Sequence, residues 1–259
     1  MSLTTPESVQ KLQRVLHDKA KEAPNFRFYA VYDKVYRKDV LSYAYEGCHA
    51  NGGAAGVDNQ TFEDIEQYGA ERWLEELTQE LKSRTYQPQP VRRVSIPKPD
   101  GKQRPLGIPT IRDRVVQTAA GLVLEPIFEA DLPREQYAYR ADRSALDAVQ
   151  HVHKLINTGH GQTVDADLSS YFDSIPHAEL MKSVARRVVD GAMLHLIESE
   201  ANSENCPHCI YFTCYRGLWT HTNQKFQVPA HAIRQHRLYG KRPRPRLFGN
   251  SDATNSCRW

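Results

Sequence analysis

The stretch TVDADLSSYFDSIP, Thr163–Pro176, decides the fold class, because its alternating apolar residues predict a strand that runs into a helix. Asp165, Asp167 and Asp173 lie among these apolar residues, so at least one carboxylate is expected at the end of a buried strand. An isolated charge is costly there unless a cation accompanies it. The stretch therefore predicts a metal ion. The plainer alternative is that the carboxylates cap the following helix and solvate a loop.

The composition indicates a folded protein with a basic surface. The chain has 259 residues, a net charge of +3 and 40% hydrophobic residues. This hydrophobic content is enough for a sizeable core, so the chain is not simply a disordered tail. Residues 84–114 hold eight Lys or Arg against two Asp, which indicates a polyanionic partner. The N-terminus has no signal pattern, and no run approaches the roughly 20 apolar residues that span a bilayer. We therefore expect a cytoplasmic protein with no membrane partner.

A β-hairpin is predicted inside the basic stretch. Val91–Pro97 alternates, residues 99–101 form a Pro-Asp-Gly turn, and Gln103–Pro109 is extended again. Lys98 and Arg104 then lie on opposite sides of the turn. Two cations on a rigid hairpin can clamp a polyphosphate, arginine by its bidentate fork and lysine as a point charge. A solvated, lysine-tipped hairpin is the alternative.

Helical periodicity accounts for most of the remaining chain before residue 200. Ser144 is expected to cap one of these helices, with Asp147 three residues further on. The expected helical segments are two helices within Met1–Glu46, a region from Thr61 to Arg84 after the glycine-rich loop Asn51–Asp58, Ile111–Ile127, Ser144–Asn157, and a helix that starts at Pro176.

Two arginines, Arg112 and Arg114, fall in the first turn of the helix expected over Ile111–Ile127. Cations at that end oppose the helix dipole unless an anion offsets them, which suggests a functional reason for their presence. These features together describe a nucleotidyl-transfer site. The cations would bind a triphosphate, the carboxylates would bind Mg²⁺, and the basic helix would bind the backbone of a nucleic-acid strand.

Several motifs, in one order, resemble a known family. GVD, IPKPDGKQRPLGIPTIRDRVVQ, EPIFE, QYAYRADRSALDAV and DADLSSYFDSIPH are similar to the N-terminal half of the reverse transcriptases encoded by group II introns, from about Ala50 to Ile197. The resemblance implies an α/β (α+β) fold, with right-hand polymerase fingers that carry the hairpin and a partial palm that carries the aspartate strand. It also implies an RNA-directed DNA polymerase whose partners are an RNA template, intron RNA, a DNA primer and deoxynucleoside triphosphates.

The same resemblance implies roles for single residues. Asp167 looks like the first catalytic aspartate, which binds both Mg²⁺ ions, and Leu168 like the residue whose backbone carbonyl binds one of them. Phe172 resembles the aromatic gate that excludes a ribose 2′-hydroxyl. Lys98 and Arg104 resemble the residues that hold the incoming triphosphate. The residues expected to bind nucleic acid are Arg92, Arg93, Arg112 and Arg114.

The sequence departs from the family after Ile197, where neither the Pro-Gln-Gly segment nor the aromatic-x-Asp-Asp turn occurs. Two metal ions need more than one carboxylate, so we expect a chain truncated before the second catalytic motif and inactive alone. The alternative is a non-catalytic, maturase-like fragment that binds intron RNA through its arginines.

The last part of the chain has a different character. From residue 201 onward, Lys and Arg outnumber acids nine to two, and regular periodicity disappears. A change of reading frame near Glu198–Ala201 explains these features. The less favoured alternative is a zinc-binding adaptor, whose ligands would include Cys206, Cys209 and Cys214.

The expected organisation has four parts. Residues 1–50 form an N-terminal helical extension, 51–160 the fingers, 161–199 the partial palm with its first catalytic Asp motif, and 200–259 a basic, Cys- and Pro-containing tail that is disordered or frame-shifted. A palm without its later strands exposes sheet edges and apolar surface, so poor solubility is expected.

Overall fold

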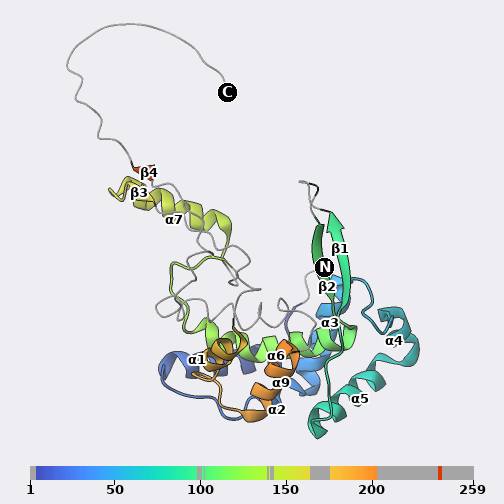
Figure 1. The fold of residues 1–259 in the computed structure, drawn as a ribbon. Helices are drawn as coiled ribbons and strands as arrows, with labels where there is room; N and C mark the ends of the chain where they lie inside the picture. The colour runs from blue at the N-terminus through green and yellow to red at the C-terminus, as the bar shows by residue number, and fades with distance from the viewer. Residues whose placement is uncertain are drawn as a thin grey trace, which may run out of the picture.

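The computed structural model describes residues 4–97, 101, 103–138, 140, 143–163, 176–202 and 239–240. Helices dominate this part of the chain, accompanied by two small antiparallel sheets (Figure 1). This mixture fits a reverse transcriptase-type α/β domain as expected. The elements are α1 Glu7–Glu22, α2 Tyr32–Val35, α3 Lys38–Asn51, α4 Phe62–Tyr68, α5 Ala70–Ser83, β1 Arg92–Pro97, β2 Gln103–Ile108, α6 Ile111–Glu129, α7 Ala145–Asn157, β3 Gln162–Thr163, α8 His177–Val184, α9 Gly191–Asn202 and β4 Tyr239–Gly240.

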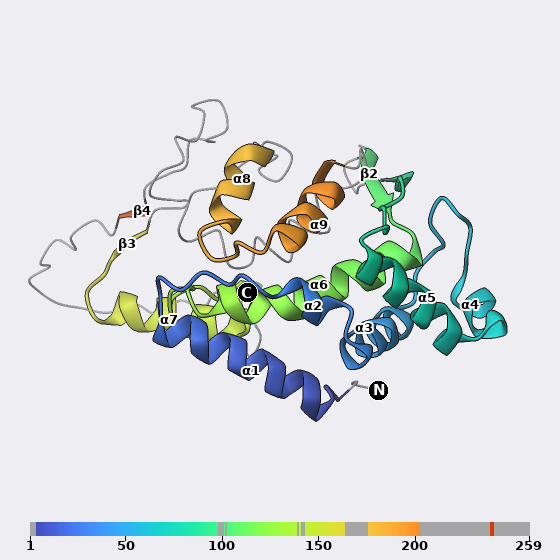
Figure 2. The same ribbon diagram turned by 90° about the horizontal axis from the view of Figure 1, so that it is seen from below.

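Helix α6 forms the centre of the core. It contacts α1, α2 and α3, and Figure 2 shows α1 and α3 on one side of it and α8 and α9 on the other. A helix covered on several sides is apolar on several faces, which explains why its sequence shows no single hydrophobic stripe. Its fully buried side chains include Ile111, Val115, Val116, Ala119, Val123 and Ile127.

The N-terminal region differs from the expectation of two helices within Met1–Glu46. It forms three helices, α1, α2 and α3, and the last of them continues to Asn51. Phe28 is extended and pairs with Val188 in an isolated parallel bridge. Asp190 accepts hydrogen bonds from the backbone N–H groups of Val31 and Tyr32, both at 2.8 Å, and so holds the start of α2. These contacts with residues about 160 positions away override the local helical periodicity.

The region expected to be helical from Thr61 to Arg84 is divided into α4 and α5. The break is at Gly69, whose φ of 106° suits glycine and ends the first helix. Trp73, Leu77 and Leu81 of α5 are buried, so one stripe of this helix faces the core.

The β-hairpin is confirmed. Strands β1 and β2 pair antiparallel, with Arg92 opposite Ile108 and Ile96 opposite Arg104. The hairpin tip, with Lys98, lies outside the described residues. Two residues after β2 the chain enters α6, so the hairpin is joined directly to the central helix.

Helix α7 begins as predicted, with a capping box between Ser144 and Asp147. None of its residues is buried, and its apolar side chains Leu146, Val149 and Val152 are 65%, 64% and 51% exposed. Of the strand expected at the start of Thr163–Pro176, the structure describes only Thr163, which lies in β3, and residues 164–175 lie outside the described residues.

Helix α8 begins directly after Pro176, as predicted, and α9 runs to Asn202. The boundary expected between residues 199 and 200 therefore falls inside α9, where Glu200 is buried. Cys48 is buried near the end of α3 and carries a free thiol. In the described part of the chain, no helix is long and apolar enough to cross a membrane.

Candidate nucleic-acid interface

One face of the hairpin combines a basic residue with exposed apolar side chains. Alternate residues of a strand share a face, so Arg92, Val94 and Ile96 lie on the same side of β1, and Leu106 lies opposite Val94. Val94, Ile96 and Leu106 are 39%, 45% and 37% exposed. Arg93 lies on the other face and is exposed. The hairpin thus presents cationic and apolar groups together, which suits contact with phosphates and bases.

Arg92 has an unsatisfied polar atom. Its Nε is buried and has no hydrogen-bond partner among the described residues. A buried guanidinium N–H without a partner is unfavourable, so an acceptor from a bound molecule would stabilise it.

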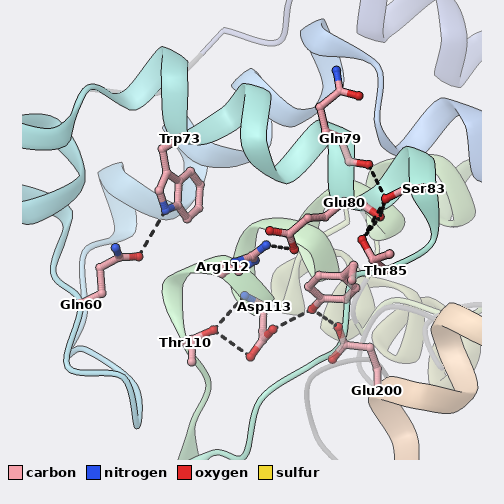
Figure 3. A network of polar contacts seen from close by, with 11 residues as sticks. Gln60, Trp73, Gln79, Glu80, Ser83, Thr85, Thr110, Arg112, Asp113 and Glu200 are labelled. Carbon is pink, nitrogen blue, oxygen red and sulfur yellow. Dashed lines mark hydrogen bonds and ion pairs between the residues drawn. The ribbon is translucent and has the colours of Figure 1, made fainter.

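Arg112 has an internal partner. Its guanidinium pairs with the Glu80 carboxylate of α5, and the two side chains are 29% and 37% exposed (Figure 3). An acidic residue of the same chain therefore supplies an anion that offsets the charge of Arg112 in the first turn of α6.

Arg114 ties the glycine-rich loop to the start of α6. It donates to the carbonyl of Pro109 at 3.2 Å, to that of Gly52 at 3.3 Å, and to that of Ala54. Backbone carbonyls thus offset this second charge in the first turn. Arg112 and Arg114 both have structural contacts, and their proposed role in binding nucleic acid stays a prediction.

The GVD motif of the loop has a packing reason. A Cβ added at Gly56 would lie 2.6 Å from Thr110 Cα and 2.7 Å from Thr110 N. These are backbone atoms, so they cannot rotate away. Glycine at this position lets the loop lie directly against the junction between β2 and α6.

Thr110 and Asp113 fix the direction in which α6 leaves the hairpin. The Thr110 hydroxyl accepts from Asp113 N–H at 3.1 Å and donates to Asp113 Oδ2 at 2.7 Å. The N–H of Gln89 donates to the same oxygen at 3.1 Å. Thr110 therefore caps α6, and Asp113 in the first turn binds both this cap and the chain that enters β1. Both Thr110 and Asp113 are buried.

A second buried carboxylate, Glu200 of α9, joins this network through Tyr86 (Figure 3). The Tyr86 hydroxyl lies 2.7 Å from Asp113 Oδ1 and 2.8 Å from Glu200 Oε1. Gln117 donates to Glu200 Oε2 at 2.8 Å. The network therefore joins α6, α9 and the segment before the hairpin.

The network needs a proton beyond that of the tyrosine. The Tyr86 hydroxyl has one hydrogen and can donate to only one of the two carboxyl groups at a time. Both contacts are hydrogen bonds if the other carboxyl group is protonated and donates to the phenol oxygen. Burial raises the pKa of Glu200 to about 7, and burial also raises the pKa of Asp113. Glu200 is therefore the group expected to carry the proton near neutral pH.

Sequence reasoning missed this network. Asp113 was counted only as one of two acids in a basic stretch, and Glu200 was placed at the start of the tail. The sequence did contain a signal for part of this network. Thr110 is followed three residues later by Asp113 at the start of an apolar helix, which is the spacing between an N-cap residue and its acidic partner.

Most of the predicted catalytic residues cannot be placed from the structure. Asp167, Leu168, Phe172 and Lys98 lie outside the described residues, as do the predicted zinc ligands Cys206, Cys209 and Cys214. Arg104 lies in β2, opposite Ile96. Within the described ranges, no group of three or more His, Cys, Asp or Glu is placed to hold a metal ion. Asp113 and Glu200 do not fit a metal site, since the Tyr86 hydroxyl lies between them.

Comparisons with known proteins agree with the resemblance. Residues 96–218 match the family described as reverse transcriptase (RNA-dependent DNA polymerase). The chain is 47% identical over 129 residues to Protein YkfC of Escherichia coli (strain K12), which covers 48% of this chain and 34% of that protein. It is 31% identical over 193 residues to the group II intron-encoded protein LtrA of Lactococcus lactis subsp. cremoris, covering 73% of this chain and 31% of that protein.

A yeast protein is also similar. The putative COX1/OXI3 intron 1 protein of Saccharomyces cerevisiae is 30% identical over 125 residues, which is 48% of this chain and 15% of that protein. The chain thus spans about a third or less of the length of these relatives.

Proposed function

This chain carries a reverse transcriptase domain related to group II intron-encoded proteins, and from that premise we propose that it forms the fingers and partial palm of such an enzyme. In this proposal the β1–β2 hairpin belongs to the fingers and binds RNA. The observation that carries the proposal is the hairpin face, where Arg92 lies beside exposed Val94 and Ile96. A basic and apolar face of this kind can pair with phosphates while its apolar groups contact bases.

The network below the hairpin supports this role. Thr110 and Asp113 hold the end of β2 and the chain before β1 on the same buried helix end. A binding element that is held rigidly loses little conformational entropy when its ligand binds. The hairpin therefore has the support that a positioning element for a template or an incoming nucleotide requires.

We propose that Mg²⁺ serves this domain through Asp167 and the Leu168 carbonyl, with Lys98 and Arg104 at the triphosphate and Phe172 at the sugar. When bound, the metal ions would neutralise the charge that develops as a primer hydroxyl attacks the α-phosphate. This assignment rests on the motif DADLSSYF and on the family match across it.

A second candidate is maturase-like binding of intron RNA without catalysis. This candidate is favoured because the hairpin face is built entirely from β1 and β2 and does not include Asp167. The two candidates predict different results for the same variant. If the chain is an enzyme, the wild type extends a primer and Asp167→Ala abolishes this extension. If it only binds RNA, the wild type extends no primer and Asp167→Ala keeps the salt-dependent affinity for RNA.

The test measures RNA binding and primer extension on the full chain. We expect Arg92→Gln with Arg93→Gln to lower the slope of log K against log salt for a 20-nucleotide RNA by about 1.4, or about 0.7 for each lost phosphate contact. Lys34→Gln with Lys38→Gln removes the same charge from the helical region that packs beside α6 and serves as the control. An equal effect of both pairs would contradict the hairpin assignment.

A further inference from the structure

A second basic site lies at the opposite end of α6 from the hairpin. A cleft of about 800 Å³ opens between the loop that follows α1 and the turn that follows α8, and Phe128 and Asp131 also line it. Figure 2 shows the hairpin strand β2 at one end of α6 and α8 towards the other. The lining side chains that carry charge are Arg27, Asp131, Lys182, Arg186 and Arg187.

Arg187 builds the cleft and does not serve as its binding group. It is 6% exposed, and its Nε forms an ion pair with Asp131 Oδ2 at 3.0 Å. Its other nitrogens donate to the carbonyl of Ala20 at 2.8 Å and to that of Pro24. The backbone bonds from Phe28 N to Arg187 O and from Val189 N to Phe28 O, both 2.7 Å, tie the same two segments together. The walls of the cleft are therefore fixed before any ligand binds.

Three further cations are available at the rim. Arg27, Lys182 and Arg186 are exposed. Arg27 donates one hydrogen bond, from Nη2 to the Ala185 carbonyl at 2.9 Å. Lys182 pairs with Glu179 at 2.7 Å, but its side chain stays 71% exposed. Asp131 is already paired with Arg187. The cleft therefore presents net positive charge to an incoming anion.

The lining favours a phosphate backbone over a free nucleotide. The aromatic residue in the cleft, Phe128, is 1% exposed and offers no face on which a base could stack. Exposed arginine and lysine side chains around a preformed cleft match successive phosphates, which carry charge without sequence information.

We propose that this cleft binds the phosphodiester backbone of the RNA strand that the hairpin also binds, so that the two sites hold one strand along α6. This inference rests on the proposed function. Helix α6 has 19 residues, and at about 1.5 Å per residue it is about 28 Å long. At about 3.4 Å per base step of a stacked strand, the two sites are about eight steps apart. A stacked RNA strand shorter than this distance does not reach from one site to the other.

The test measures the binding of 6-nucleotide and 20-nucleotide RNAs to the full chain as salt is varied. The cleft variant carries Lys182→Gln and Arg186→Gln. The matched control carries Lys11→Gln and Arg14→Gln, which remove the same charge from exposed positions of α1 away from the cleft. Thermal unfolding of both variants checks that they remain folded.

For the 20-nucleotide RNA, we expect the cleft variant to lower the slope of log K against log salt by about 1.4 and the control to leave it unchanged. For the wild-type chain, we expect the affinity to rise steeply between the two lengths, and this rise should shrink in the cleft variant. If the cleft variant behaves like the control while Arg92→Gln with Arg93→Gln still weakens binding, the cleft proposal is wrong and the proposed function stands. If the wild-type chain shows no salt-dependent RNA binding, both are wrong.

Discussion

The Tyr86 hydroxyl lies 2.8 Å from Glu200 Oε1, so a contact between residues 114 positions apart closes the base of the hairpin onto α9. The same hydroxyl lies 2.7 Å from Asp113 Oδ1. Two carboxyl groups thus share one phenol in a buried site. Because buried polar groups are costly without partners, this site makes the position of the hairpin dependent on its hydrogen bonds.

The first prediction concerns the phenol. Tyr86→Phe removes the bridging hydroxyl and leaves both carboxyl groups short of one hydrogen bond, so we expect the free energy of unfolding to fall by about 1–3 kcal/mol. Urea unfolding followed by circular dichroism measures the change. Tyr29→Phe is the control, because Tyr29 is 72% exposed and its change should have little effect. Equal stability of the two variants would show that the network contributes nothing.

The second prediction concerns pH. The pKa of Glu200 is raised from 4.5 to about 7 by burial, so the folded protein holds a proton that the unfolded chain releases between these values. This stabilisation is complete below about pH 4.5 and is lost as the pH rises through about 7, with an upper bound of about 3 kcal/mol. We expect wild-type Tm to fall between about pH 5 and pH 8.

Glu200→Gln tests this directly. The amide is neutral at every pH in that range and can donate to the Tyr86 oxygen, so the variant should lose less Tm than the wild type as the pH rises. Differential scanning calorimetry at several pH values gives the comparison. A parallel fall in both proteins would mean that another group controls the pH dependence.

The third prediction concerns the glycine of GVD. Gly56→Ala places a Cβ against Thr110 backbone atoms at 2.6 and 2.7 Å, so the loop or the start of α6 must shift, and we expect a loss of about 1–3 kcal/mol. Gly47→Ala is the matched control, because a Cβ there meets nothing within 4 Å and lies within helix α3. Alanine at residue 47 should leave stability unchanged or raise it by up to about 1 kcal/mol. The idea fails if Gly56→Ala is as stable as Gly47→Ala.

The fourth prediction concerns solubility. Helix α7 exposes Val149 and Val152 at 64% and 51%, and an exposed apolar stripe promotes association. Val149→Lys with Val152→Lys should reduce binding of the dye ANS and raise the concentration at which the protein stays in solution. Light scattering and ANS fluorescence measure both. Gln150→Lys with His153→Lys adds lysines at neighbouring exposed positions of α7, and an equal gain from this pair would point to charge instead of the apolar face.

Local sequence patterns were sufficient to predict those elements whose turn or cap interactions join residues only a few positions apart. The hairpin followed from alternation around Pro-Asp-Gly, and the start of α7 followed from Ser144 and Asp147, because turn and cap interactions join neighbours in sequence. The break at Gly69 was missed, since the apolar stripe of α5 continues the spacing of α4 across it. The extended conformation at Phe28 was missed because its partner is Val188.

The sequence by itself determined the similarity to reverse transcriptases and the order of the motifs, because these reside in runs of adjacent residues that match as a linear pattern. Only the tertiary structure showed that Arg112 pairs with Glu80, that Arg114 binds loop carbonyls, and that Glu200 meets Tyr86. The physical reason is that a charge takes its partner from whatever the fold brings within a few ångströms. That distance depends on packing around α6 and not on spacing along the chain.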